Sequence, residues 1–292
     1  MPELPEIHTT VEGLKKTVIG KTIKDVWSDY HLKTAHGEKQ TIKNKKYFVD
    51  FKRKVKGAEI IGAERRGKNI LINLNNDHTI LVHLKLTGAL IYKKEKQEKY
   101  VHLIFIFESG DYLLLSDLRK FASVILTKTN DLYLHDNIKN LGPDPFRIEL
   151  KEFRENIKKK KNWPIKSTLL DQGVVAGIGN IYSDEILWQT SIHPLSYSEK
   201  IPEKKFKDIF KVMQKILHFS IKHGGDSKSD YRNIYGEKGG FQDFHKAYGK
   251  KNKKCPKRGC GGIIARMVVR GRSAHFCPEH QILYQKKIYE RH

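Results

Sequence analysis

The chain has 292 residues, which is enough for one large domain or two ordinary ones, each with its own core. A hydrophobic fraction of 38% indicates a globular protein and argues against an intrinsically disordered chain. The 56 Lys and Arg residues outnumber the 33 Asp and Glu residues, and the net charge of +23 favours a polyanionic partner such as nucleic acid. Charge alone separates neither DNA from RNA nor an enzyme from a passive binder.

The hydropathy pattern predicts no membrane segment. No apolar run approaches the ~20 residues that span a bilayer. The N-terminus is acidic and lacks the apolar core of a signal peptide. We therefore expect a cytoplasmic, nucleoid-associated protein that does not bind membranes.

The first residues carry the signals of a helix start. Pro5 suits an early helical position, and Glu3 and Glu6 suit the positive end of the helix dipole. Apolar residues then recur at helical spacing, at Ile7, Val11, Leu14 and Val18. Gly20 is expected to end this helix.

The region from about residue 22 to residue 128 is strand-like. Short apolar segments are separated by turn residues such as Ser109-Gly110-Asp111, a spacing typical of a β-sandwich. The predicted strands are Thr22–Trp27, Ala58–Ala63, Asn69–Leu74, Thr79–Leu84, Ala89–Tyr92, Val101–Phe107, Tyr112–Leu115 and Ser123–Thr127. The basic stretch Lys33–Lys56 is expected to be a loop or an insertion.

The strand signals stop near Leu141-Gly142-Pro143, and a lysine-rich stretch, Lys151–Lys161, marks a domain boundary. The second half of the chain has helical patterns, at Lys166–Asp171, Asn180–Thr190 and Glu203–Lys222. Gly224-Gly225 is expected to close the last of these helices, and a polar, glycine-rich segment, Asp226–Phe241, follows it.

The three cysteines all lie between residues 255 and 277, which argues against a disulfide framework. Together with one histidine they form two pairs suited to a tetrahedral, structural Zn²⁺: Cys255, Cys260, Cys277 and His280. The strand-like segments Ile263–Val269 and Ser273–Phe276 predict a metal-pinned hairpin with Arg272 at its tip, suited to a phosphate or a groove. The alternative is three buried cysteines and a surface histidine.

The segment Gly177–Tyr182 lies between two helical stretches. Its glycines allow a tight turn, and Asn180 is expected to open the next helix, where backbone N–H groups and the side-chain amide bind a phosphate oxygen. The alternative is a simple helix–helix corner with Asn180 as the N-cap.

Seven short motifs, in order along the chain, resemble those of formamidopyrimidine-DNA glycosylases and their endonuclease VIII relatives. They are Met1–Glu6, Arg65–Lys68, His83–Gly88, Asp117–Phe121, Asn140–Pro143, Gly177–Tyr182 and Gly271–Ser273. The resemblance implies a multidomain α+β protein with DNA held between its two halves. The expected domains are a helix plus β-sandwich (1–146), a helix–two-turn–helix domain (147–225), a lesion-binding loop region (226–247) and a β-hairpin zinc finger (248–292).

The resemblance also implies a catalytic group. After removal of the initiator Met, the amine of Pro2 attacks the damaged nucleotide and forms a Schiff base, which allows β- and then δ-elimination. Glu3 transfers protons, Glu6 orients the N-terminus, and Lys68, on a strand of the family's fold, reaches the active site. Taken alone, Pro2 could also be a helix-entry proline, Glu3 a surface residue that complements the helix dipole, and Lys68 a solvated lysine.

Further residues match DNA-binding positions of the family. Those expected to bind phosphates are His83, Asn180 and Arg272. Those expected to fill the gap left by an extruded base are Leu86, Arg119 and Phe121. Leu86 stands where the family usually has Met, and core packing is the alternative for Leu86 and Phe121.

Two features favour oxidised purines, namely 8-oxoguanine and formamidopyrimidines, as substrates. Leu4 matches this branch, whereas the endonuclease VIII branch usually has Gly there, and Asp226–Phe241 resembles a lid over the base. The residues expected to contact the lesion are Asp226, Lys228, Ser229, Asp230 and Tyr231. The sequence therefore predicts a monomeric, bifunctional DNA glycosylase and abasic-site lyase of base-excision repair, with duplex DNA as its partner and one structural Zn²⁺.

Alternatives remain open at this point. One is an endonuclease VIII-like enzyme that acts on oxidised pyrimidines, and another is a non-catalytic zinc-ribbon protein that only binds nucleic acid.

The zinc module departs from the family pattern. Its first cysteine pair is separated by four residues instead of two, and His280 replaces a cysteine.

Overall fold

The computed structural model describes residues 1–30, 41–95, 98–228 and 230–285. The chain forms two compact units, each built from two separate stretches of sequence. The first unit contains Met1–Lys139 and Ser220–Gln242, and the second contains Asn140–Phe219 and the chain from Asp243 onward. Within the described ranges, no helix has the length and apolar character needed to cross a membrane.

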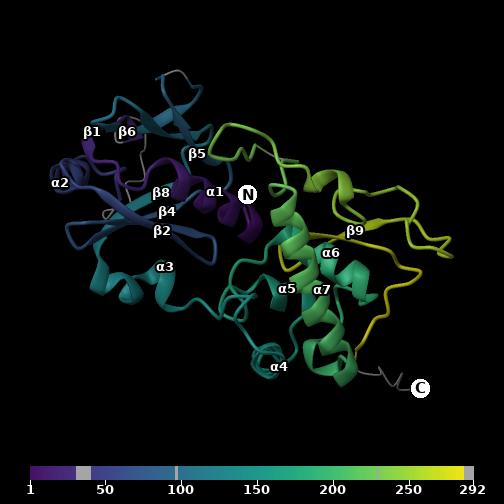
Figure 1. Ribbon diagram of the computed structural model, residues 1–292. Coiled ribbons are helices and arrows are strands. Elements are labelled where there is room, and N and C mark those ends of the chain that lie inside the picture. Colours follow the sequence, from purple (N-terminus) through teal and green to yellow (C-terminus); the bar gives the residue numbers. More distant parts are fainter. Residues whose placement is uncertain (31–40, 96–97, 229, 286–292) are drawn as a thin grey trace, which may run out of the picture. The chain divides into compact units, whose positions relative to one another are not determined.

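Two four-stranded antiparallel sheets make up most of the first unit (Figure 1). One has the order β1-β6-β7-β5, with bounds Ile23–Ser28, Val101–Phe107, Tyr112–Asp117 and Gly88–Lys93. The other has the order β2-β3-β4-β8, with bounds Ile60–Arg66, Asn69–Leu74, His78–His83 and Ser123–Lys128. Each of the eight predicted strands overlaps an observed one, although β2 extends three residues beyond the predicted Ala58–Ala63, and buried side chains of both sheets join one core cluster.

Helix α1 (Leu4–Thr17) packs against β2 and β3 and places its apolar stripe in that core. The predicted N-terminal helix is therefore confirmed. Pro5 lies in its first turn, where a missing N–H group is tolerated, and the acidic Glu6 lies near the positive end of the helix dipole.

The expectation of a loop over Lys33–Lys56 is wrong for its second half. Residues 31–40 lie outside the described part of the chain, but Lys45–Val55 forms helix α2. The side chain of Asn44 caps this helix by accepting a hydrogen bond from the N–H of Tyr47 at 3.1 Å. Its buried face consists of Phe48, Phe51 and Val55. This narrow apolar stripe was not recognised in the sequence because lysines surround it.

Two connections cross between the sheets side by side at one end of the sandwich. In the first sheet, Gly88 at the start of β5 pairs with Asp117 at the end of β7. In the second sheet, His83 at the end of β4 pairs with Ser123 at the start of β8. The β4–β5 connection (residues 84–87) and the β7–β8 connection (residues 118–122) must therefore be neighbours.

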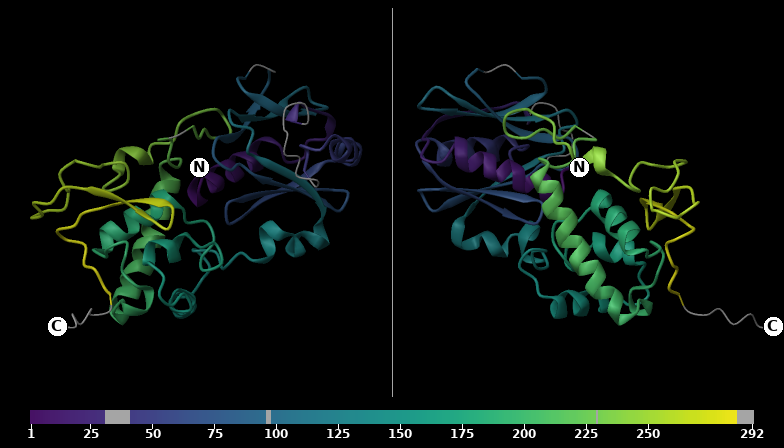
Figure 2. Two further views of the ribbon diagram at one scale, coloured as in Figure 1. Left: turned by 180° about the vertical axis from the view of Figure 1, so that it is seen from behind. Right: turned by 45° about the vertical axis from the view of Figure 1, so that its right-hand side comes forward.

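Helices dominate the second unit (Figure 2). They are α4 (Leu150–Lys158), α5 (Ile165–Leu170), α6 (Asn180–Thr190) and α7 (Glu203–Lys222), and the last residues of α7 continue into the first unit. The predicted helices α5, α6 and α7 are confirmed. Helix α4 was missed because only Phe153 and Ile157 form its buried face in a lysine-rich sequence. The short α3 (Asp136–Lys139) belongs to the first unit.

The predicted hairpin near the C-terminus is also confirmed, as strands β9 (Ala265–Val269) and β10 (Arg272–Phe276). Arg270 and Gly271 form its two-residue turn with φ values of 46° and 78°, as a tight hairpin turn requires. Arg272 is therefore not at the tip as expected. It begins β10 and pairs with Val269.

Candidate functional site

The carboxylate of Glu6 joins the start of α1 to a distant segment of the same unit. Its Oε2 accepts a hydrogen bond from the N–H of Glu3 at 2.7 Å, and its Oε1 accepts one from the N–H of Asp226, also at 2.7 Å. Pro2 is buried, and Glu3 and Glu6 are only 2% and 1% exposed. The predicted nucleophile and proton-transfer residue thus lie directly before helix α1, which Glu6 ties to the predicted lesion-binding loop.

Residues 226–242 form a segment anchored to α1 at several points. The hydroxyl of the buried Tyr231 donates a hydrogen bond to the carbonyl oxygen of Glu6 at 3.0 Å, and burial raises the pKa of Tyr231. Ile234 is 1% exposed and lies so close to α1 that a Cβ at Gly13 would be 2.2 Å from its Cγ2. The segment is therefore packed into the core of the first unit.

Two of the backbone groups expected to contact the lesion already have partners in this conformation. The N–H of Asp226 donates to Glu6, and the N–H of Lys228 donates to Oδ1 of Asp226 at 3.0 Å. Asp230 is exposed, and Ser229 lies outside the described residues. A contact between a base and the N–H of Asp226 or Lys228 requires the exchange of these internal hydrogen bonds.

Lys68 lies in the two-residue turn between β2 and β3, not on a strand as the resemblance implies. It is 7% exposed. The next residue, Asn69, pairs with His83, so the turn lies beside the end of β4. The structure thus brings two of the predicted site residues together.

The imidazole of His83 is neutral at physiological pH. Burial and the positive charges of Lys85 and Lys68 lower the pKa of His83 to about 3. Its Nδ1 accepts a hydrogen bond from the N–H of Lys85 at 3.0 Å, which leaves the proton on Nε2. His83 can therefore offer an N–H donor to a phosphate, but no positive charge.

The two neighbouring connections carry the three residues predicted to fill the gap in DNA. Leu86 lies half-buried on the first connection. Arg119 and Phe121 lie on the second, with the guanidinium of Arg119 over the ring of Phe121, 4.5 Å from its centroid, and with Phe121 43% exposed. Packing in the interior is thus ruled out for Phe121.

Asp117 joins these two connections, a role that sequence reasoning did not assign to it. It is fully buried, and its Oδ1 accepts hydrogen bonds from the hydroxyl of Thr87 and the N–H of Arg119. Its Oδ2 accepts hydrogen bonds from the hydroxyl of Tyr30 and the N–H of Ala122. The sequence showed Asp117 only as the first residue of the motif Asp117–Phe121, which indicated no hydrogen-bond partners for it.

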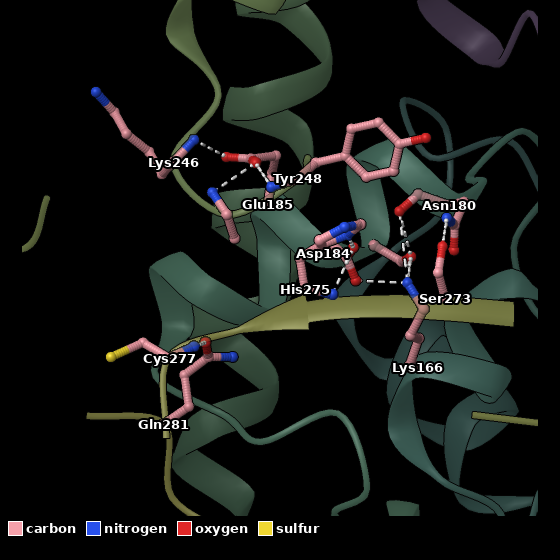
Figure 3. A network of polar contacts seen from close by, with 12 residues as sticks. Lys166, Asn180, Asp184, Glu185, Lys246, Tyr248, Ser273, His275, Cys277 and Gln281 are labelled. Atoms are coloured by element: carbon pink, nitrogen blue, oxygen red, sulfur yellow. Dashed lines mark hydrogen bonds and ion pairs between the residues drawn. The ribbon is translucent and has the colours of Figure 1, made fainter. Parts of the chain in front are cut away.

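In the second unit, Asn180 is the first residue of α6, and Gly179 is its N-cap. The alternative of Asn180 as the N-cap is therefore wrong. Gly177 has a φ of 110°, which only glycine adopts easily, and it turns the chain into the helix. The side-chain Nδ2 of Asn180 donates to Oγ of Ser273 at 3.0 Å (Figure 3). The exposed Arg272 directly precedes Ser273 in the chain, so its backbone lies near this helix start.

The ligand atoms of Cys255, Cys260, Cys277 and His280 lie within 4.8 Å of one another. The distances are 3.5 Å from Cys255 Sγ to His280 Nδ1, 3.6 Å from Cys260 Sγ to Cys277 Sγ, and 3.8 Å from Cys260 Sγ to His280 Nδ1. A tetrahedral Zn²⁺ with Zn–S bonds of about 2.3 Å places its ligands about 3.5–3.8 Å apart. The cluster has the geometry of a structural metal site.

The surroundings of the cluster suit metal binding. Nε2 of His280 lies 3.1 Å from the carbonyl oxygen of Trp188, and a hydrogen bond there leaves Nδ1 free to face the thiols. Burial lowers the pKa of His280, which keeps the imidazole neutral, and the N–H of Gly262 lowers the pKa of Cys260. These two shifts favour the protonation states that coordinate a metal, whereas burial raises the pKa of Cys277 to about 11, so this thiol loses its proton only as the metal binds.

Comparison with known proteins identifies the family. Residues 1–124 match the family model of the formamidopyrimidine-DNA glycosylase N-terminal domain, and residues 141–232 match that of the H2TH domain. The formamidopyrimidine-DNA glycosylase of Lactobacillus acidophilus is 37% identical, with 98% of this chain and 100% of the relative covered. That of Streptococcus pneumoniae is 36% identical, with 96% and 99% covered.

Solved structures agree with this assignment. The Lactococcus lactis Fpg in complex with DNA containing an abasic site has a TM-score of 0.84 and 32% identity, with 94% of this chain and 98% of that chain covered. MutM in complex with DNA containing carbocyclic 8-oxo-G has a TM-score of 0.83 and 32% identity, with 95% and 98% covered. Both halves of the chain therefore match relatives of known fold, and the protein belongs to the formamidopyrimidine-DNA glycosylase family.

Proposed function

We propose that this protein removes oxidised purines from duplex DNA and then cleaves the abasic site, as a glycosylase and lyase of base-excision repair. Family membership over nearly the whole chain gives the class of enzyme. The observation that carries the chemistry is the pair Pro2 and Glu3, buried at the start of α1.

Removal of Met1 turns Pro2 into a secondary amine. An α-amino group has a pKa of about 7.7–8 before perturbation, so a useful fraction is unprotonated at neutral pH. The amine attacks C1′ of the damaged nucleotide, and the bond between C1′ and the base breaks. The bond between C1′ and the ring oxygen O4′ then opens as O4′ takes up a proton, which leaves an iminium between the proline nitrogen and C1′. The iminium withdraws electrons, so loss of a proton from C2′ expels the 3′ phosphate, and a second elimination expels the 5′ phosphate.

Glu3 moves protons in this scheme. Its carboxylic acid protonates the sugar ring oxygen as the base leaves, and its carboxylate accepts a proton during elimination. Glu6 is a positioning residue, because its hydrogen bond to the N–H of Glu3 fixes the backbone next to the nucleophile. Lys68 contributes a positive charge at the turn beside His83.

The remaining residues of the site hold DNA. Neutral His83 donates one hydrogen bond to a phosphate, and Asn180 and Arg272 bind the backbone from the second unit. Leu86, Arg119 and Phe121 occupy the gap that an extruded base leaves. Lesion contacts from Asp226, Lys228, Ser229, Asp230 and Tyr231 remain part of this proposal.

Zinc is the metal that the cluster of three cysteines and one histidine fits best. Cys255, Cys260, Cys277 and His280 would hold it with no open position, so the ion supplies a structural cross-link and no catalysis. Since β9 and β10 lie between the ligand pair Cys255 and Cys260 and the pair Cys277 and His280, this cross-link supports the hairpin that carries Arg272.

Borohydride trapping tests the chemistry and the lesion class together. Duplexes that contain 8-oxoguanine or 5,6-dihydrouracil are incubated with the mature protein and reduced, and the covalent adduct is measured. We expect an adduct on 8-oxoguanine that is lost in Glu3→Gln and absent in a form that retains Met1. Trapping on dihydrouracil alone would assign the enzyme to oxidised pyrimidines, and no adduct on either duplex would leave a protein that only binds DNA.

A further inference from the structure

A buried network in the second unit links three elements and includes no residue assigned to catalysis or to the metal (Figure 3). Lys166 of α5, Asp184 of α6 and His275 of β10 are 0%, 1% and 8% exposed. Nζ of Lys166 lies 2.5 Å from Oδ1 of Asp184. Oδ2 of Asp184 accepts hydrogen bonds from the backbone N–H of His275 at 2.9 Å and lies 3.0 Å from its Nδ1.

The unfavourable free energy of burying these charges indicates that the network has a role beyond packing. Removing a lysine and an aspartate from water is unfavourable, and apolar residues of similar volume often stabilise a protein at least as well. The ion pair instead fixes the positions of α5, α6 and β10 relative to one another. Each carboxylate oxygen of Asp184 is committed to a different element, so neither α5 nor β10 can slide along α6 without breaking a buried contact.

The network is one of two contacts between the same faces of α6 and β10. Asn180 and Asp184 are four residues apart on one side of the helix, and Ser273 and His275 are two residues apart on one side of the strand. Asn180 contacts Ser273, and Asp184 contacts His275. Two contacts fix both the distance and the angle between α6 and β10, whereas a single contact would allow the strand to rotate relative to the helix.

This arrangement determines where the phosphate-binding groups lie. Arg272 precedes Ser273 directly, and Asn180 opens α6. Lys166 also reaches towards Asn180, with its Nζ 3.5 Å from the Asn180 carbonyl oxygen. The buried network is thus joined to the segments that carry both proposed phosphate-binding residues, Asn180 and Arg272, although none of its three members is exposed enough to contact DNA.

We infer that Asp184, together with Lys166 and His275, is a positioning group that sets the spacing between Asn180 and Arg272 for binding the DNA backbone. The inference rests on the proposed function, in which Arg272 binds a phosphate. The network acts on DNA only through the two residues that it holds. Its loss should therefore matter when Arg272 is present and not when Arg272 is absent.

A double-mutant cycle tests this coupling. The dissociation constant for a duplex with a tetrahydrofuran abasic-site analogue is measured for the wild type, Asp184→Asn, Arg272→Ala and the double variant. We expect Asp184→Asn to weaken binding about tenfold, as expected for a lost hydrogen bond to a charged group, and the same change to have less than about a twofold effect in Arg272→Ala. In Asp184→Asn the slope of log Kd against the logarithm of the salt concentration should also fall by about 0.9, which corresponds to the loss of one phosphate contact.

Glu185→Gln is the matched control. Glu185 is the next residue on α6 and is also buried, but its carboxylate accepts hydrogen bonds from the N–H groups of Lys246, Ala247 and Tyr248 and not from β10. Glu185→Gln should lower the melting temperature, yet its effect on binding should be the same with and without Arg272. If Asp184→Asn does not fold, Lys166→Met combined with Asp184→Asn replaces it, because this pair buries no lone charge.

The outcomes separate the inference from the proposed function. If Arg272→Ala leaves DNA binding and its salt dependence unchanged, the proposed role of Arg272 is wrong and the inference falls with it. If Arg272→Ala weakens binding but the two effects multiply independently, with the salt dependence unchanged in Asp184→Asn, Arg272 keeps its role and the network is only structural.

Discussion

His83 couples the proposed DNA-binding surface to stability through its protonation. Its pKa of about 3 in the folded state lies below the value of about 6.5 in the unfolded chain. Between these values the unfolded state binds a proton that the folded state does not. The stability from neutral His83 is therefore fully present above pH 6.5 and is lost as the pH falls towards 3.

We predict that His83→Gln removes this pH dependence. The free energy of unfolding of the wild type should fall more steeply than that of the variant from pH 6.5 to pH 5, by at most about 1.4 kcal/mol per pH unit. Urea denaturation at pH 7, 6 and 5 measures the difference. Parallel curves would mean that His83 titrates normally in the folded protein.

At the scale of single residues, the sequence identified those that belong to short motifs, such as Pro2, Glu3 and Asn180. It included Asp117 in a motif but did not reveal its role, because the residues that Asp117 binds lie on other segments of the chain. It also could not pair Glu6 with Asp226, which lies 220 positions away. Local patterns reveal a residue type and its spacing, but not its distant partner.

At the scale of elements, Asp117 holds the β4–β5 and β7–β8 connections together. In Asp117→Asn one acceptor oxygen becomes a donor that faces hydrogen-bond donors. We predict that release of 8-oxoguanine from paired DNA falls about tenfold or more, equivalent to at least 1.4 kcal/mol, while cleavage of an existing abasic site changes less than about threefold. Single-turnover rates on the two substrates measure this ratio.

Asp111→Asn provides the control for that experiment. Asp111 accepts hydrogen bonds from Lys21 and Tyr92 at the other end of β7, away from both connections. It should leave the ratio of the two rates unchanged. An equal loss on both substrates in Asp117→Asn would contradict a role in filling the gap.

The anchored segment 226–242 depends on close backbone approach at Gly239. A Cβ there would lie 2.2 Å from the carbonyl oxygen of Gly225, next to the Asp226 N–H that binds Glu6. We predict that Gly239→Ala displaces the segment and lowers excision of 8-oxoguanine about tenfold or more, with abasic-site cleavage less affected.

Gly240→Ala is the neighbouring control, because its Cβ would meet only the carbonyl oxygen of His223 at 3.7 Å, an ordinary contact. The rates of base excision and of abasic-site cleavage, measured for both variants, test whether the segment depends on close packing at Gly239. Equal rates for Gly239→Ala and the wild type would show that the segment does not need this packing.

Long apolar periods made most elements predictable. The eight strands of the sandwich and the helices α5, α6 and α7 follow the sequence pattern closely. Helices α2 and α4 were missed because each buries only two or three apolar residues among many lysines. Their helical state depends on the core that these few residues reach, and the local sequence contains little information about that core.

For the whole molecule, the two units should respond differently to loss of metal. The core cluster of the first unit consists of residues up to Val124 together with Ile234, and it contains no residue of the second unit. The metal cluster belongs to the second unit, where His280 packs edge-on against Trp188. Chelation is therefore expected to unfold the hairpin region and to leave the sandwich folded.

We predict that a strong chelator changes the fluorescence of Trp188 and abolishes DNA binding, while the sheet signal in circular dichroism and one thermal transition persist. Trp188→Phe should remove the fluorescence change without preventing metal binding, which elemental analysis checks. Loss of all structure in a single transition would show that the two units fold as one.

The sequence by itself determined the order of the strands and of the helices with long apolar stripes, the ligands of the candidate metal site and the motifs that define the family, because each depends on residues close together in the chain. Only the tertiary structure placed Glu6 against Asp226, Ile234 against Gly13, and Asp184 between Lys166 and His275. These contacts join residues far apart in the sequence. Their formation depends on how complete elements pack, which no local pattern of residues specifies.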